Sequence, residues 1–201
     1  MKVLLVHGLW NSRHWLAPLA WRLRRAGFDP ELFGYASLFA GAEAAMPRLA
    51  ERIAASGCHG VVGHSLGGLL ALETLQHWPA PAVTRVVCLG SPLLGSATAG
   101  GLHGFGAALA LGRSAPMLHR GVQPWPGQPA VGMIAGNVAH GFGRWFARLE
   151  GASDGTVAVA ETRWPGLSDH CELPVGHSGL LLSAAAATQV AHFLREGRFV
   201  H

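Results

Sequence analysis

Lysine is almost absent from the sequence. Among 15 lysine and arginine residues Lys2 is the only lysine, and it stands at the beginning of the chain. The chain has no G-x-x-x-x-G-K-[ST] or S-x-x-K motif and no interior amine for a Schiff base, which excludes P-loop and pyridoxal chemistry. The arginines are scattered and form no run, so the formal net charge of +4 does not indicate a nucleic-acid partner.

Cysteine is also scarce. The three cysteines, Cys58, Cys88 and Cys171, are odd in number and show no C-x-x-C spacing. This pattern argues against a disulfide framework and against a zinc knuckle, so we expect buried, reduced thiols. No two of the 12 histidines have H-x-x-x-H or H-x-x-E-H spacing, and we therefore expect no metal site.

Long hydrophobic runs are missing as well. The apolar run at the start is interrupted at His7 with no small-residue cleavage site after it, and the run from Gly179 has about half of the ~20 residues that a membrane span needs. We therefore expect no membrane span and a cytoplasmic location.

Segments typical of strands alternate with segments typical of helices along the whole chain. At 201 residues the length suits one domain, 1–201. The alternation predicts an α/β fold with about six mainly parallel strands and helices on both faces of the sheet. The expected strands are 2–7, 30–36, 59–63, 83–90, 129–136 and 170–175, and the expected helices are 12–27, 42–57 with a kink or restart at Pro47, 66–78 and 179–197.

The segment 92–128 does not follow this alternation. It is rich in Gly, Ala and Pro and contains short helical fragments such as 104–112. Long loops in compact domains are usually functional or hold small helices, so we interpret 92–128 as an excursion above the sheet and not as a second domain.

The stretch VVGHSLGGLLALE places Ser65 in a G-x-S-x-G motif between an expected strand and an expected helix. A serine hydroxyl is a poor nucleophile unless it is exposed, near a base and beside donors for the oxyanion. A sharp strand-to-helix turn exposes it, and such a turn needs small residues at Gly63 and Gly67. The helix that follows directs free N–H groups, beginning with that of Leu66, at the reaction centre.

Four short motifs together resemble the α/β-hydrolase family, and more closely its small, lidless bacterial lipases and esterases. They are VHGLW after the first expected strand, GHSLGG at Ser65, SDGTV at Asp154 and VGHSGLL at His177, and they span nearly the full length. The order Ser, Asp, His is the chain order of that fold. The resemblance implies a Ser65, Asp154, His177 triad, oxyanion donors at the Leu9 and Leu66 N–H groups, little or no cap and no cofactor.

The base and the acid each have competitors in the sequence. His177 is favoured because it follows the last expected strand, at the edge where the Ser65 turn also emerges, whereas His7 and His64 are expected to hold loop geometry. His103, His119 and His140 are expected in loops or on the surface. Asp169 is the alternative acid, but it precedes the last strand, at the end opposite His177. The family pattern matches Asp154, although 137–153 must then contain an extra helix that returns the chain to the site.

The expected activity is hydrolysis of short- to medium-chain carboxylic esters through an acyl-enzyme. Thioesterase or acyltransferase activity on the same triad, and a non-catalytic binding protein with this fold, remain alternatives. The first loop reads HGLW and not HGGG, which by resemblance suits esters of primary alcohols. Apolar residues that could line an acyl pocket are Trp10, Leu66, Leu93, Leu94 and Trp125.

Overall fold

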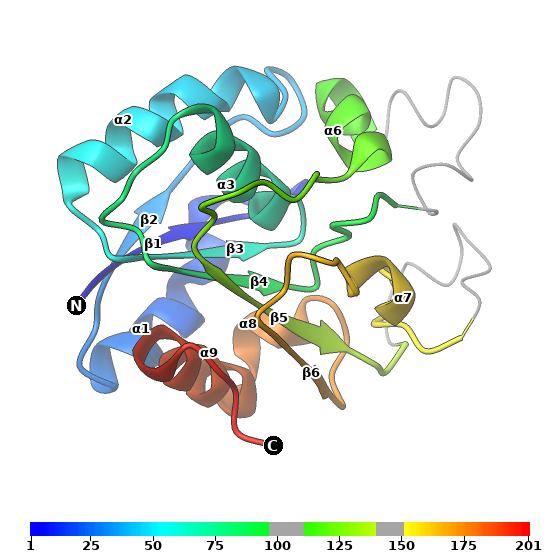
Figure 1. Ribbon diagram of the computed structural model, residues 1–201. Helices are drawn as coiled ribbons and strands as arrows, with labels where there is room; N and C mark the ends of the chain where they lie inside the picture. Colours follow the sequence, from blue (N-terminus) through cyan, green and yellow to red (C-terminus); the bar gives the residue numbers. More distant parts are fainter. Residues whose placement is uncertain (97–110, 140–150) are drawn as a thin grey trace.

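A six-stranded sheet forms the centre of the protein, in the order β2-β1-β3-β4-β5-β6 (Figure 1). The computed structural model describes residues 1–96, 111–139 and 151–201. All neighbouring strands are parallel, as predicted. The strands are β1 (Lys2–Val6), β2 (Asp29–Phe33), β3 (Gly60–His64), β4 (Arg85–Leu89), β5 (Ala130–Gly136) and β6 (Asp169–Leu173).

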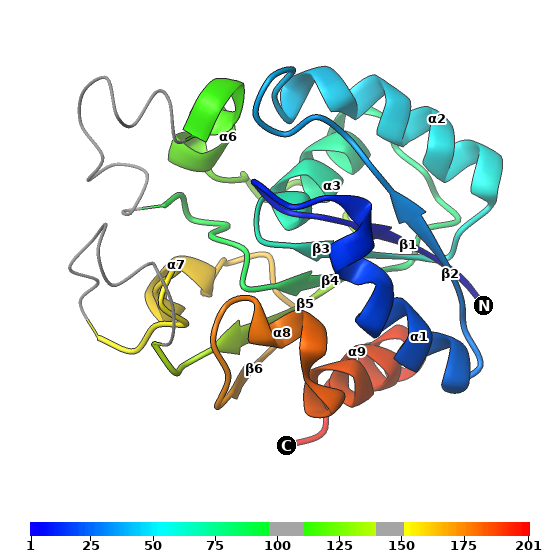
Figure 2. The same ribbon diagram turned by 180° about the vertical axis from the view of Figure 1, so that it is seen from behind.

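Helices cover both faces of this sheet, which was also predicted. One face carries α1, α8 and α9, and the other carries α2 and α3, with α6 beside α3 (Figures 1 and 2). Each face has its own core of buried aliphatic side chains. The helices are α1 (Ala17–Arg25), α2 (Met46–Ser56), α3 (Leu66–His77), α6 (Ala115–Arg120), α7 (Val159–Thr162), α8 (Gly179–Leu182) and α9 (Ala184–Glu196), with 3₁₀ turns at Arg13–Leu16, Glu43–Ala45 and Gly112–Ser114.

The most enclosed elements are those around the G-x-S-x-G motif. Every residue of β3 is buried, and so is every residue of α3 from Leu66 to Leu75. The apolar run Val61–Val62 in β3 fits this position, because a parallel strand between covered faces needs no polar side, and the buried stretch of α3 is apolar except for Glu73 and Thr74. Ser65 therefore lies at the junction of the two most buried elements of the fold.

Two predicted helices have different bounds in the structure. The closing helix is broken at Ser183, whose backbone is extended (φ −71°, ψ 129°) and whose hydroxyl accepts a hydrogen bond from Ala186 N–H. Serine competes with the helical backbone in this way, so one predicted helix becomes α8 and α9. Pro47 lies in the first turn of α2 after a 3₁₀ turn, so it restarts the helix.

Two other helical predictions fall on residues that the structure does not describe. These are the fragment 104–112, except for its last two residues, and most of the return segment 137–153. Across the described ranges, no helix has the length and apolar character of a membrane span.

The strand order reverses between β1 and β3, which is where ligands bind in open parallel sheets. The loops that leave the carboxyl ends of these two strands carry Gly8 and Ser65. They touch: a Cβ built on Gly8 would lie 2.9 Å from Ser65 Cβ. The fold thus brings the HGLW and GHSLGG motifs together at the position typical of a binding site.

Gly63→Ala should destabilise the protein because the backbone of α3 lies directly against this residue. A Cβ on Gly63 would lie 2.4 Å from Gly68 N and 2.5 Å from Gly67 C. We expect the free energy of unfolding to fall by about 1–3 kcal/mol, the usual cost of overpacking, in urea titrations. Gly179→Ala is the control, since its Cβ would meet only Val175 Cβ at 3.5 Å. An equal loss in both variants would contradict this account.

Candidate active site

Ser65 occupies a strained turn between β3 and α3. Its φ of 53° and ψ of −125° are unusual for a residue with a side chain, and its N–H donates to the Leu89 carbonyl at 2.8 Å. A Cβ on Gly67 would lie 2.4 Å from Val6 O, so the first turn of α3 packs on the end of β1. Strain of this kind costs about 1–3 kcal/mol and persists where the surroundings enforce it. The predicted sharp turn is confirmed.

Asp154 and His177 form a close pair. His177 Nδ1 lies 2.6 Å from Asp154 Oδ2, and His177 N–H donates to the Asp154 carbonyl at 2.9 Å. The Asp154 side chain is 1% exposed and that of His177 is 14% exposed. The carboxylate accepts a hydrogen bond from Nδ1–H, so Nε2 carries the lone pair and is the ring nitrogen that can take a proton.

A tight turn fixes the Asp154 carboxylate. Oδ1 accepts hydrogen bonds from the N–H groups of Thr156 (2.9 Å) and Val157 (2.8 Å), so Oδ2 is the oxygen left for His177. Gly155 has a φ of 91°, which suits glycine, and the turn is closed by a bridge between Ser153 and Ala158. The D-G-T-V sequence thus has a local structural reason.

His64 connects the Ser65 turn to the loop that carries His177. Its Nε2 lies 3.1 Å from the His177 carbonyl oxygen, and the two ring centroids are 4.7 Å apart. Burial, followed by the nearby His177, lowers the pKa of His64 to about 3. His64 is therefore neutral and donates through Nε2–H. The prediction that His64 holds backbone geometry is confirmed, but its partner could not be read from the sequence.

Gly90 shows how closely the segments converge. A Cβ built there would lie 2.9 Å from Asp154 Oδ2 and 3.2 Å from His177 Nδ1, and Gly90 directly follows Leu89, the hydrogen-bond partner of Ser65. The turn after β3, the loop after β4 and the segments that carry Asp154 and His177 therefore meet at the carboxyl edge of the sheet.

The two residues expected to supply oxyanion donors both adjoin the Ser65 turn. Leu66 begins α3 with its side chain fully buried in the core, so only its backbone faces the turn and its side chain does not line a pocket. Leu9 follows Gly8, whose Cα lies against Ser65, and its side chain packs on the same core.

The other residues proposed for an acyl pocket have mixed positions. Trp10 and Leu94 are 61% and 52% exposed in loops after β1 and β4. Leu93 is fully buried in the core, so it does not line an open pocket. Trp125 leads into the amino end of β5, opposite the Ser65 edge, and packs on Trp164 with a ring distance of 6.4 Å. Hydrophobicity alone does not distinguish core from pocket in such loops.

Asp169, the alternative acid, serves a different purpose. It begins β6, and its carboxylate accepts hydrogen bonds from Phe199 N–H (2.7 Å) and His201 Nε2 (3.0 Å). Partial burial opposes its ionisation, but these bonds and that from His170 N–H outweigh it and lower its pKa. Asp169 thus anchors the C-terminal segment.

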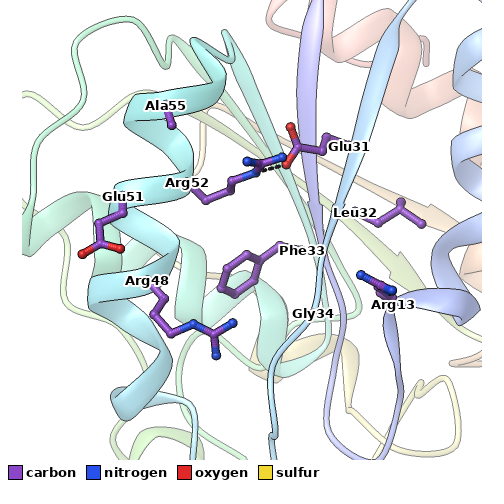
Figure 3. Close-up of a pocket in the computed structure, with 9 residues that line it drawn as sticks. All are labelled: Arg13, Glu31, Leu32, Phe33, Gly34, Arg48, Glu51, Arg52 and Ala55. Atoms are coloured by element: carbon purple, nitrogen blue, oxygen red, sulfur yellow. Dashed lines mark hydrogen bonds and ion pairs between the residues drawn. The ribbon is translucent and has the colours of Figure 1, made fainter.

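Metal ligands and grooves are two further features that bear on a candidate active site. Over residues 1–96, 111–139 and 151–201, no three His, Cys, Asp or Glu side chains are grouped to hold a metal. A groove of about 470 Å³ lies between β2 and α2 on the outer edge of the sheet, where Arg52 pairs with Glu31 (Figure 3). Its lining includes neither Ser65 nor His177.

The remaining cysteine and histidine predictions concern residues outside the expected triad. Cys58, Cys88 and Cys171 are free and buried, as expected, and burial raises the pKa of Cys88 to about 12. His119 is exposed in α6, whereas His103 and His140 lie outside the described residues.

Several solved structures superpose on this chain. A metagenomic carboxyl esterase superposes with a TM-score of 0.66 at 17% identity over 88% of this chain and 64% of its own. The RedJ thioesterase of Streptomyces coelicolor superposes with a TM-score of 0.62 at 16% identity, over 98% of this chain and 90% of its own. An Arabidopsis methylesterase superposes with a TM-score of 0.64 at 14% identity, over 97% of this chain and 98% of its own. The chain has the α/β-hydrolase fold.

This similarity is visible in structure and not in sequence. No protein-family model matches the chain, and no curated protein matches it either. The fold implied by the four motifs is confirmed by the superpositions, which at 14–17% identity say nothing more about the chemistry. The chain covers less than two thirds of the metagenomic esterase.

Stability should depend on pH through His64. Because its pKa is about 3 in the folded protein and about 6.5 when unfolded, its contribution is complete above pH 6.5 and falls as the pH drops toward 3. Because His64 takes up a proton only in the unfolded state, it alone should lower the free energy of unfolding by about 2 kcal/mol between pH 7 and pH 5. His64→Gln keeps a donor for the His177 carbonyl but cannot titrate, so urea titrations should show that much less pH dependence. An unchanged pH dependence would count against a buried neutral His64.

Asp154 and Asp169 should differ sharply as catalytic groups. Asp154→Asn keeps a hydrogen bond to His177 but favours the wrong tautomer, and we expect kcat to fall by about 10⁴, as in the serine-protease template. Asp169→Asn should change kcat only a few fold, because its partners are in the C-terminal segment. Ester hydrolysis by both variants, with circular dichroism to verify folding, measures this. A large loss only in Asp169→Asn would overturn the assignment.

Proposed function

We propose that the protein is a serine hydrolase that cleaves carboxylic esters through an acyl-enzyme. The observation that carries this proposal is the 2.6 Å contact between His177 Nδ1 and a buried Asp154 carboxylate, beside a serine in a strained strand-to-helix turn. These are the roles of base, orienting acid and nucleophile in a catalytic triad. The neighbouring α/β-hydrolase structures, which include a carboxyl esterase and a methylesterase, support the same reaction class.

In the proposed reaction Ser65 Oγ attacks the ester carbonyl while His177 Nε2 takes its proton. The negative charge that develops on the carbonyl oxygen is bound by the Leu9 and Leu66 N–H groups. The C–O bond to the alcohol then breaks as His177 returns the proton to the leaving oxygen. Water repeats the sequence on the acyl-serine, releasing the acid and the free Ser65. No cofactor enters any step.

A thioester is the second candidate substrate. The RedJ thioesterase superposes over 98% of this chain, and the same triad chemistry applies with a thiol leaving group. Short- or medium-chain esters of primary alcohols remain the first choice. An acyltransferase, which passes the acyl group to an acceptor other than water, would use the same three triad residues.

Covalent labelling tests the nucleophile directly. A fluorophosphonate probe should label Ser65 in the native protein, and Ser65→Ala should abolish both labelling and hydrolysis without loss of the fold. Ser91→Ala is the matched control, because Ser91 is fully buried and should not react. Label found on another serine would refute the assignment, and hydrolysis-competent Ser65→Ala would refute the mechanism.

A substrate series then distinguishes the candidates. Ethyl esters of increasing acyl length, the matched thioesters and a tert-butyl ester should rank with the short- or medium-chain ethyl esters first. Higher kcat/KM on the thioesters would favour a thioesterase. Failure to label Ser65, together with no turnover of any of these substrates, would favour the non-catalytic binding protein.

A further inference from the structure

His7, the residue before Gly8 in the HGLW loop, has a fixed tautomer. Its Nδ1 lies 2.8 Å from the Gly8 carbonyl oxygen, which can only accept, so Nδ1 carries the proton. Its Nε2 accepts a hydrogen bond from the Tyr35 backbone N–H at 3.2 Å, so this nitrogen carries the lone pair. Only the neutral ring can make both bonds, and burial lowers the pKa of His7 accordingly.

Tyr35, the only tyrosine in the chain, holds the His7 ring from the side. The two rings are stacked with centroids 4.5 Å apart, and the Tyr35 hydroxyl donates to the His7 carbonyl at 3.2 Å. A Cβ on Gly67 would lie 2.7 Å from the same carbonyl oxygen, so the first turn of α3 closes the other side. His7 is therefore held both by contacts with its ring and by contacts with its backbone carbonyl.

These contacts determine where the next N–H group points. The Gly8 carbonyl and the Leu9 N–H belong to one planar trans peptide, in which the two groups point in opposite directions. Because the carbonyl points at the His7 ring, Leu9 N–H points away from it. Gly8 itself lies against Ser65 Cβ.

From this geometry we infer that His7 and Tyr35 are positioning residues that orient Leu9 N–H as an oxyanion donor for the Ser65 reaction. The inference rests on the proposed function, since an oxyanion forms only if Ser65 attacks a carbonyl group. Neither residue touches the substrate. Leu66 N–H is positioned separately by α3, so it provides an internal comparison.

His7→Phe is the decisive variant, because it keeps an aromatic ring for stacking but removes the bond to the Gly8 carbonyl. Loss of one oxyanion donor costs about 10²–10³ in kcat, so we expect kcat to fall by about 10² and KM to change less than about threefold. Tyr35→Phe keeps the ring and the backbone N–H but removes the bond to the His7 carbonyl, and should lower kcat by about tenfold. If His7→Phe does not fold, Tyr35→Phe still tests the proposal.

A transition-state analogue separates positioning from mere stability. An alkyl boronic acid forms a tetrahedral adduct with a nucleophilic serine, so its inhibition constant should rise in each variant by the same factor as kcat/KM falls. Phe33→Leu is the matched control, since Phe33 lies 6.2 Å from the Tyr35 ring at the end of β2 and makes no hydrogen bond to His7 or Gly8 within the described residues. It should leave both constants within about threefold.

Proton–nitrogen NMR gives a readout that does not depend on turnover. In the native protein the boronate should shift the amide protons of Leu9 and Leu66 downfield, whereas in His7→Phe only the Leu66 shift should remain. If both shifts persist in His7→Phe, or if KM rises while kcat is unchanged, the positioning role is overturned. If the native protein forms no boronate adduct and hydrolyses no ester, the proposed function fails and the inference falls with it.

Discussion

The contact between the first turn of α3 and the ends of β1 and β3 is the constraint on which the site depends. Gly63 and Gly67 have no side chains to separate these backbones, so Ser65 is held in a conformation that it would not adopt alone. The burial of β3 and α3 supplies the rigidity that maintains this strain. A site built on such elements is more exact than one built on loops.

Buried neutral histidines extend this rigid centre to the neighbouring loops. An imidazole that is uncharged can donate from one nitrogen and accept at the other, which no other side chain does on a planar ring. His7 uses this property between Gly8 and Tyr35, and His64 donates to the loop of His177. Burial lowers the pKa of both, so they are neutral, as the proton uptake proposed for His177 requires.

The elements with local signals were predictable from the sequence, and those set by distant contacts were not. Strand and helix order followed from apolar runs, and the Ser65 turn followed from its glycines. The role of Tyr35 and the anchoring of the C-terminal segment by Asp169 depend on partners far away in the sequence. The break at Ser183 is different, because it is a local cap that accepts from Ala186 N–H. Leu93 and Trp125 show the same limit, because an apolar loop residue looks alike whether it faces core or substrate.

Asp154 lies far along the chain from the end of β5, so contacts close to Asp154 itself must hold its carboxylate 2.6 Å from the His177 ring nitrogen. Contacts with the loop after β4 are among them. Leu94 N–H donates to the Glu161 carbonyl at 3.1 Å, and Glu161 in turn accepts from Ala158 N–H at the end of the Asp154 turn. The turn that carries Asp154 is thus attached to the loop after β4.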